Sequence, residues 1–137
     1  MVASRLNPYL NFDGQAREAI EFYQSVFGGE LHVNTYGEFG GPDPATADRI
    51  MHGQLETPQG YTLMVSDIPP GETYKAGASI TVSLSGDPGE GLEDAWHKLS
   101  EGGQVQVPFE KQMWGDVFGQ CTDRFGIPWM VNVVAAS

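Results

Sequence analysis

Residues 16–33, AREAIEFYQSVFGGELHV, combine a helical pattern, a glycine pair and the beginning of a strand. Apolar residues recur three and four positions apart from Ala16 to Phe27, and this spacing predicts an amphipathic helix. Asp13 is the expected N-cap of that helix. Gly28-Gly29 ends it, because glycine readily adopts the positive φ that a helix C-terminus requires.

The same order recurs 74 residues further along the chain. Residues 92–107, LEDAWHKLSEGGQVQV, again place a helical pattern before a glycine pair, Gly102-Gly103, and an alternating strand. Asp87-Pro88-Gly89-Glu90 predicts the start of this second helix, with an N-cap, a proline and an acidic residue in the expected order. The repeat indicates an internal duplication.

The segments between the helices alternate apolar and polar residues, as half-buried strands do. With 18 glycines and 9 prolines, the chain also has the composition of a protein with many turns. We therefore expect an α+β fold in one domain, 1–137, built from two β-α-β-β-β modules at 4–68 and 78–134. Residues 69–77 are the expected linker, and the modules should form a curled, mainly antiparallel sheet around a cleft. The alternating segments are 6–12, 62–66, 79–85, 105–109 and 127–133.

The charge balance excludes several classes of partner. Seven Lys and Arg residues against eighteen Asp and Glu residues give a net charge of −11, which disfavours binding to nucleic acid. No segment approaches the ~18 apolar residues of a membrane helix, so we expect no membrane insertion and a cytoplasmic location. The single cysteine, Cys121, excludes an internal disulfide and a multi-cysteine zinc site.

Alternation also predicts which side chains lie on the sheet face opposite each helix. That face should carry polar groups and a few large apolar ones, a mixture typical of ligand sites. The alternative is that this face is merely solvated. The candidate substrate-binding residues are Asn7, Tyr9, His52, Gln54, Met64, Ser79, Thr81, Trp114, Phe118, Gln120, Met130 and Asn132.

Four further features carry the remaining chemical expectations. His52 is the candidate catalytic residue, because imidazole titrates near neutral pH; the alternative is a structural, hydrogen-bonded histidine. Asp67 is expected to cap a turn at the end of a strand. Cys121 is expected to be a buried, unreactive thiol. The acidic Gly/Pro segment 37–48 is expected to be a mobile loop, with a lid over the cleft as a further option.

Taken together, the motifs resemble those of the glyoxalase/bleomycin-resistance superfamily, also called the vicinal oxygen chelate superfamily. Finer features resemble its PhnB-like branch, which is often labelled demethylubiquinone-methyltransferase-like. The resemblance covers nearly the whole chain, and its motifs are NPYL (7–10), FDGQAREAIEFY (12–23), VFGG (26–29), MH (51–52), LMVSD (63–67), WGD (114–116), FG (118–119) and DRFGIPWMVN (123–132).

The resemblance also implies where a metal would bind. Enzymes of the superfamily typically hold a divalent metal with His and Glu side chains from the first, fourth, fifth and eighth strands. The matching positions here are Asn7, Met64, Ser79 and Met130. Since none is a carboxylate or an imidazole, we expect no metal site and no cofactor.

Two functions stay open at this point. The first is a metal-free protein that binds a small hydrophobic or aromatic molecule. The second is an enzyme of glyoxalase or dioxygenase type acting on a small oxygenated substrate. The sequence has no glycine-rich loop for an S-adenosyl cofactor after a strand, so no feature of it accounts for the methyltransferase label. The resemblance further implies a homodimer.

Overall fold

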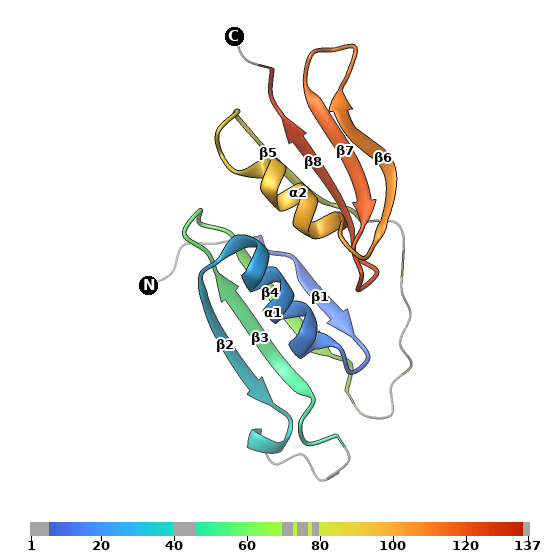
Figure 1. Cartoon of the computed structure of the whole chain (residues 1–137). Helices are drawn as coiled ribbons and strands as arrows, with labels where there is room; N and C mark the ends of the chain where they lie inside the picture. The colour runs from blue at the N-terminus through green and yellow to red at the C-terminus, as the bar shows by residue number, and fades with distance from the viewer. Residues whose placement is uncertain (1–5, 40–45, 70–72, 74–76, 78–79, 136–137) are drawn as a thin grey trace. The chain divides into compact units, whose positions relative to one another are not determined.

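A computed structural model describes residues 6–39, 46–69, 73, 77 and 80–135. The chain divides into two compact units, residues 1–75 and residues 76–137 (Figure 1). Within the described residues, each unit contains one α-helix and one four-stranded sheet. Each unit is therefore described by itself.

Unit 1 contains β1 (Tyr9–Phe12), α1 (Ala16–Phe27), β2 (Glu30–Thr35), β3 (Ile50–Glu56) and β4 (Thr62–Asp67), with a short 3₁₀ helix η1 (Gly37–Phe39) after β2. The strand order is β1-β4-β3-β2. β1 runs parallel to β4, and the other neighbours are antiparallel. The predicted loop 37–48 contains η1, but its residues 40–45 lie outside the described residues.

Unit 2 contains β5 (Val82–Gly86), α2 (Leu92–Ser100), β6 (Gln104–Lys111), β7 (Val117–Thr122) and β8 (Pro128–Val133). Its strand order, β5-β8-β7-β6, repeats that of unit 1, again with one parallel pair and two antiparallel pairs. The pairing of Gly53 with Val65 in unit 1 recurs as Gly119 with Val131 in unit 2. The α+β class and the internal duplication are therefore confirmed.

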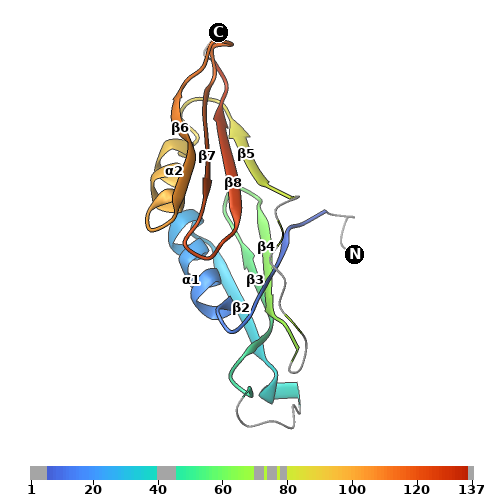
Figure 2. The ribbon, with the colours of Figure 1, turned by 90° about the vertical axis from the view of Figure 1, so that its right-hand side faces the viewer.

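In each unit the helix packs across one face of its own sheet (Figure 2). α1 buries Ile20, Tyr23 and Phe27 against β3 and β4, and α2 buries Trp96 and Leu99 against β7 and β8. Glycines under the helices permit this close approach. A Cβ atom at Gly119 would lie 2.9 Å from the Trp96 ring, closer than real Cβ contacts allow.

The predicted helix starts are wrong in both units. Gln15, not Asp13, is the N-cap residue of α1, and Asp13 instead forms an ion pair with Arg49 at 2.9 Å. The cap comes from Asp67, whose Oδ1 accepts hydrogen bonds from the amides of Gly14 and Ala16. Asp67 thus caps a helix rather than a turn.

α2 begins at Leu92 with Gly91 as its N-cap, four residues after the predicted N-cap Asp87. The preceding residue, Gly91, has φ +80°, a conformation that ends the turn 87–91 and sets the direction of the helix. Among the described residues, no side chain hydrogen-bonds to the N-cap position of α2.

Three residues expected on the apolar side of strands are exposed instead. Leu6 precedes β1, and Ile80 precedes the first β5 pair, Val82 with Trp129, so neither has a sheet neighbour to pack against. Val105 lies in β6 beside an irregularity in the pairing with β7, which interrupts the alternation. The 123–126 turn is present as expected, with Gly126 at φ +88°.

Candidate functional site

Each sheet has a distal face, defined here as the face opposite the helix of the same unit. On the distal face of unit 1, Tyr9, Met64 and Gln54 lie side by side across β1, β4 and β3. Because side chains alternate along a strand, His52 and Glu56 share this face with Gln54. The face is polar apart from Met64.

A chain of hydrogen bonds runs along β3 on this face, and we call its members the polar chain. The Tyr9 hydroxyl lies 3.3 Å from His52 Nδ1, and His52 Nε2 lies 3.4 Å from Gln54 Oε1. The Gln54 side-chain amide donates to Glu56 Oε1, and the Thr62 hydroxyl donates to Glu56 Oε2 at 2.7 Å. The polar chain is Tyr9, His52, Gln54, Glu56 and Thr62.

The order of donors fixes the tautomer of a neutral His52. An ionised Glu56 only accepts hydrogen bonds, so Gln54 must direct its NH₂ group toward it. The Gln54 oxygen then faces His52 and accepts a hydrogen bond from Nε2–H. The remaining ring nitrogen, Nδ1, accepts from the Tyr9 hydroxyl. His52 is therefore oriented from both sides, with its Nδ1 lone pair directed at a phenol that is 45% exposed.

The distal face of unit 2 has a different character. Ser83, Met130 and Gln120 form one row across β5, β8 and β7, and Ser85, Asn132 and Phe118 form the next. Trp114 lies on the turn before β7, 60% exposed, with its ring centroid 6.3 Å from that of Phe118. This face thus presents two aromatic rings and a thioether among small polar groups.

Asp116 fixes the end of that second row. Its carboxylate accepts hydrogen bonds from the Asn132 side chain at 3.1 Å and from the Ala135 amide at 2.8 Å. These two bonds lower the pKa of Asp116 below its ordinary value, with the Asn132 bond contributing most. Asn132 is consequently held with its amide group toward Asp116.

The structure gathers most of the twelve candidate residues into two groups, one in each unit. Tyr9, His52, Gln54 and Met64 share the distal face of unit 1. Phe118, Gln120, Met130 and Asn132 share that of unit 2, with Trp114 beside Phe118. Asn7 and Thr81 lie just before β1 and β5, and Ser79 lies outside the described residues.

Sequence reasoning missed two residues that organise these groups. Glu56 continues the alternation of His52 and Gln54, so extending the predicted strand by one step would have found it. Asp116 lies in a turn and binds Asn132 and Ala135 only through the β7–β8 pairing, and no local pattern signals this.

The donor atoms at the superfamily's metal positions do not suit a divalent cation. Asn7 offers a neutral amide oxygen, and Met64 and Met130 offer thioethers, which are poor ligands for hard cations. The strand pairing also corrects one assignment. Tyr9 and Ser83 occupy equivalent places beside Met64 and Met130, so the counterpart of Asn7 is Thr81 rather than Ser79. Within the described residues, no three His, Cys, Asp or Glu side chains are grouped so as to hold a metal.

Cys121 lies in β7 with its side chain in the core, as expected. Burial raises the pKa of its thiol to about 11, and the negative charge of Asp123 adds to the shift. The thiol is therefore protonated at neutral pH, and the thiolate that a nucleophile requires is disfavoured.

Comparison with known proteins agrees with this architecture. A family described as 3-demethylubiquinone-9 3-methyltransferase matches residues 4–132. The chain belongs to this PhnB-like family. Its fold is the one that the resemblance to the vicinal oxygen chelate superfamily implies. Within the described part of the chain, no helix is long and apolar enough to cross a membrane.

Several relatives of this PhnB-like protein span nearly its whole length. Protein YjdN of Escherichia coli K12 is 32% identical over 94% of this chain and 95% of its own. The crystal structure of PA1353 from Pseudomonas aeruginosa is 36% identical, with a TM-score of 0.83 over 98% of this chain and 100% of that one. FosX from Listeria monocytogenes, described as a fosfomycin resistance protein complexed with Mn(II) and sulfate, shares the fold at 9% identity; its TM-score is 0.62, with 98% and 95% of the two chains covered.

Proposed function

We propose that this protein binds a small aromatic or hydrophobic molecule without a metal, on the distal face of unit 2. The observation that carries the proposal is the exposed Trp114 beside Phe118, on a face that also carries Met130. The family resemblance assigns the Met130 position to a metal ligand. Trp114 and Phe118 offer ring faces for stacking, and Met130 offers a polarisable sulfur. Gln120 and Asn132 supply neutral hydrogen-bonding groups that would orient the ligand.

Contact area is the main source of affinity in this proposal. An aromatic ligand that covers Trp114 and Phe118 would remove about 100–200 Å² of apolar surface from water, worth on the order of 3–5 kcal/mol before entropic costs. No charged anchor is needed. We further propose, from the family resemblance, that the chain forms a homodimer.

Isothermal titration with 2-naphthol and catechol tests the proposal. Trp114→Ala should weaken binding of the better probe at least tenfold, whereas Trp114→Phe should retain most of the affinity. Met113→Ala is the matched control, because Met113 is the neighbouring residue and 98% exposed. Equal affinities for Trp114→Ala and Met113→Ala would contradict the proposal.

A second candidate function rests on the polar chain of unit 1. His52 is held between Tyr9 and Gln54, with its acceptor nitrogen Nδ1 toward the Tyr9 hydroxyl, and this pair is suited to moving a proton to or from a small oxygenated substrate. The class of reaction would be that of a glyoxalase or a dioxygenase.

Turnover assays separate the two candidates. The substrates are the hemithioacetal of methylglyoxal with glutathione and, in air, catechol. If His52 transfers a proton, His52→Ala should lower kcat by roughly 10²–10⁴-fold. Reproducible turnover that His52→Ala abolishes and Trp114→Ala spares would replace the binding proposal with an enzymatic one.

A further inference from the structure

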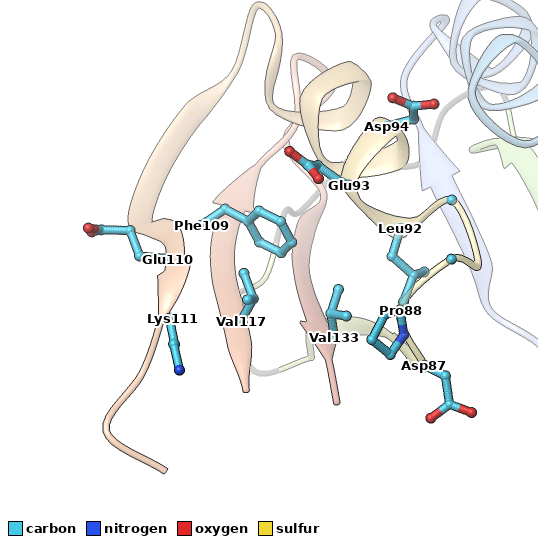
Figure 3. Close-up of a pocket in the computed structure, with 12 residues that line it drawn as sticks. Asp87, Pro88, Leu92, Glu93, Asp94, Phe109, Glu110, Lys111, Val117 and Val133 are labelled. Atoms are coloured by element: carbon cyan, nitrogen blue, oxygen red, sulfur yellow. The ribbon is translucent and has the colours of Figure 1, made fainter. Parts of the chain in front are cut away.

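A groove of about 620 Å³ lies in unit 2, on the helix-covered side of its sheet and therefore away from the distal face (Figure 3). It runs from the turn before α2 to the β6–β7 edge. Its volume is within the range of sites that bind small organic molecules.

The floor of the groove is apolar. Leu92, Phe109, Val117 and Val133 point into it from α2, β6, β7 and β8, and Pro88 closes one end (Figure 3). Phe109 is fixed in place because its ring stacks on that of Trp96, with centroids 5.4 Å apart. The floor is thus a rigid hydrophobic surface on regular elements.

Comparison with unit 1 explains why this space is open. Asp67 occupies in β4 the place that Val133 occupies in β8. The Asp67 carboxylate accepts hydrogen bonds from the amides of Gly14 and Ala16 at the start of α1 and from the amide of Ile50 at the start of β3, and so ties that end of the helix to the sheet. Val133 has no polar atom to do the same for α2, so the equivalent end of unit 2 stays open.

Acidic side chains surround the groove. Asp87, Glu93, Asp94 and Glu110 line it together with a single cation, Lys111. The Glu93 side chain extends over the groove toward Phe109, with its Oε1 3.7 Å from His97 Nε2, whereas the carboxylates of Asp87, Asp94 and Glu110 point away from the floor (Figure 3). The local excess of negative charge repels anions and attracts cations.

We propose that this groove binds an amphipathic organic cation. Its hydrocarbon or aromatic body lies on the floor formed by Leu92, Phe109, Val117 and Val133, and its ammonium group lies beside Glu93. The site is separate from the distal face, and it does not depend on the function proposed above.

Two probes of matched size and opposite charge test the inference. They are 4-phenylbutyl-trimethylammonium and 5-phenylpentanoate, each titrated into ¹⁵N-labelled full-length protein at low ionic strength. The cation should shift the amide resonances of Leu92, Val117 and Val133, and the anion should bind at least tenfold more weakly.

Two variants distinguish packing from charge. Val117→Phe fills the groove and should abolish binding of the cation. Glu93→Gln should weaken it about fourfold, the effect expected for one unit charge at roughly 5 Å in water. Glu21→Gln is the matched control, because it removes the same charge from an exposed position on α1 and should leave the affinity unchanged.

Three results together would support the proposal. Glu21→Gln should bind the cation with unchanged affinity, Glu93→Gln should bind it more weakly, and a folded Val117→Phe should not bind it. Equal binding of the cation and the anion, or shifts outside the groove, would overturn it. If Val117→Phe does not fold, the test is the affinity of Glu93→Gln for the cation relative to that of Glu21→Gln. Equal affinities of these two variants would overturn the proposal.

Discussion

Asp67 joins three elements of unit 1 through one buried carboxylate. It lies at the end of β4 and accepts hydrogen bonds from Gly14 at 2.7 Å, Ala16 at 3.1 Å and Ile50 at 2.9 Å. The first two bonds satisfy amides at the N-terminus of α1, where a negative charge also interacts favourably with the helix dipole. The side chain is 1% exposed, so water cannot replace these bonds.

Replacing this carboxylate should therefore destabilise the protein. We expect Asp67→Asn to lower the free energy of unfolding by about 1–3 kcal/mol, because its NH₂ group would face a backbone donor. Urea denaturation followed by circular dichroism measures the change. Asp48→Asn, at an exposed position, is the control and should change little. Equal stability of the two variants would show that Asp67 is not a structural cap.

The hydrogen bonds of Asp116 lead to a prediction about how stability depends on pH. The pKa of its carboxyl is lowered, mainly by the Asn132 side chain, so the native state favours the ionised form. The stabilisation is present above the ordinary aspartate pKa and is lost as the pH falls through the lower, folded value. An NMR titration of Asp116 should show the lowered pKa, and Asn132→Ala should raise it toward the ordinary value. An unchanged pKa in Asn132→Ala would contradict the assigned cause.

At the scale of elements, the glycine pairs control how each helix returns to its sheet. A Cβ atom at Gly29 would lie 2.1 Å from the carbonyl oxygen of Glu56, and one at Gly103 would lie 2.1 Å from that of Thr122. Backbone therefore occupies the space that a side chain would need. The two units use the same close contact at the start of β2 and β6.

Both substitutions should therefore be destabilising. Gly29→Ala and Gly103→Ala should each cost about 1–3 kcal/mol, since backbone must shift to admit the methyl group. Gly29→Ala should be the more severe, because Gly29 also has φ +104°, which strains any other residue. Gly77→Ala is the control, because none of the described residues lies within 4 Å of the position that its added methyl group would take. Thermal unfolding measures all three. A neutral result at either Gly29 or Gly103 would argue against the shared contact.

The same elements show what the sequence could and could not predict. The helical spacing of apolar residues, the glycine pairs and the alternation of apolar and polar residues predicted the duplicated elements, because these signals are local. The cap of α1 was missed because its acceptor, Asp67, lies 53 residues beyond Gly14. Alternation also placed Tyr9, His52 and Gln54 on one face, yet the hydrogen bonds that orient His52 depend on the β1–β4–β3 pairing. The groove in unit 2 was not foreseen, since it follows from Val133 standing where unit 1 has Asp67.

At the scale of the whole molecule, the two units share a topology but differ in chemistry. Unit 1 has the polar chain around His52 on its distal face and a helix start bound by Asp67. Unit 2 has Trp114 and Phe118 on its distal face and an open groove beside α2. The two units thus share one architecture but present different surfaces. In the same way, membership of a family does not by itself assign an activity.

The central claim is that small molecules bind without a metal, and one comparison tests it directly. Isothermal titration with 2-naphthol is performed on protein purified gently and on the same protein after treatment with a chelator, with elemental analysis of both samples. We predict the same affinity in both samples and no stoichiometric divalent metal in either. One equivalent of Mn, Fe, Ni or Zn per chain, whose removal abolishes binding, would contradict the account.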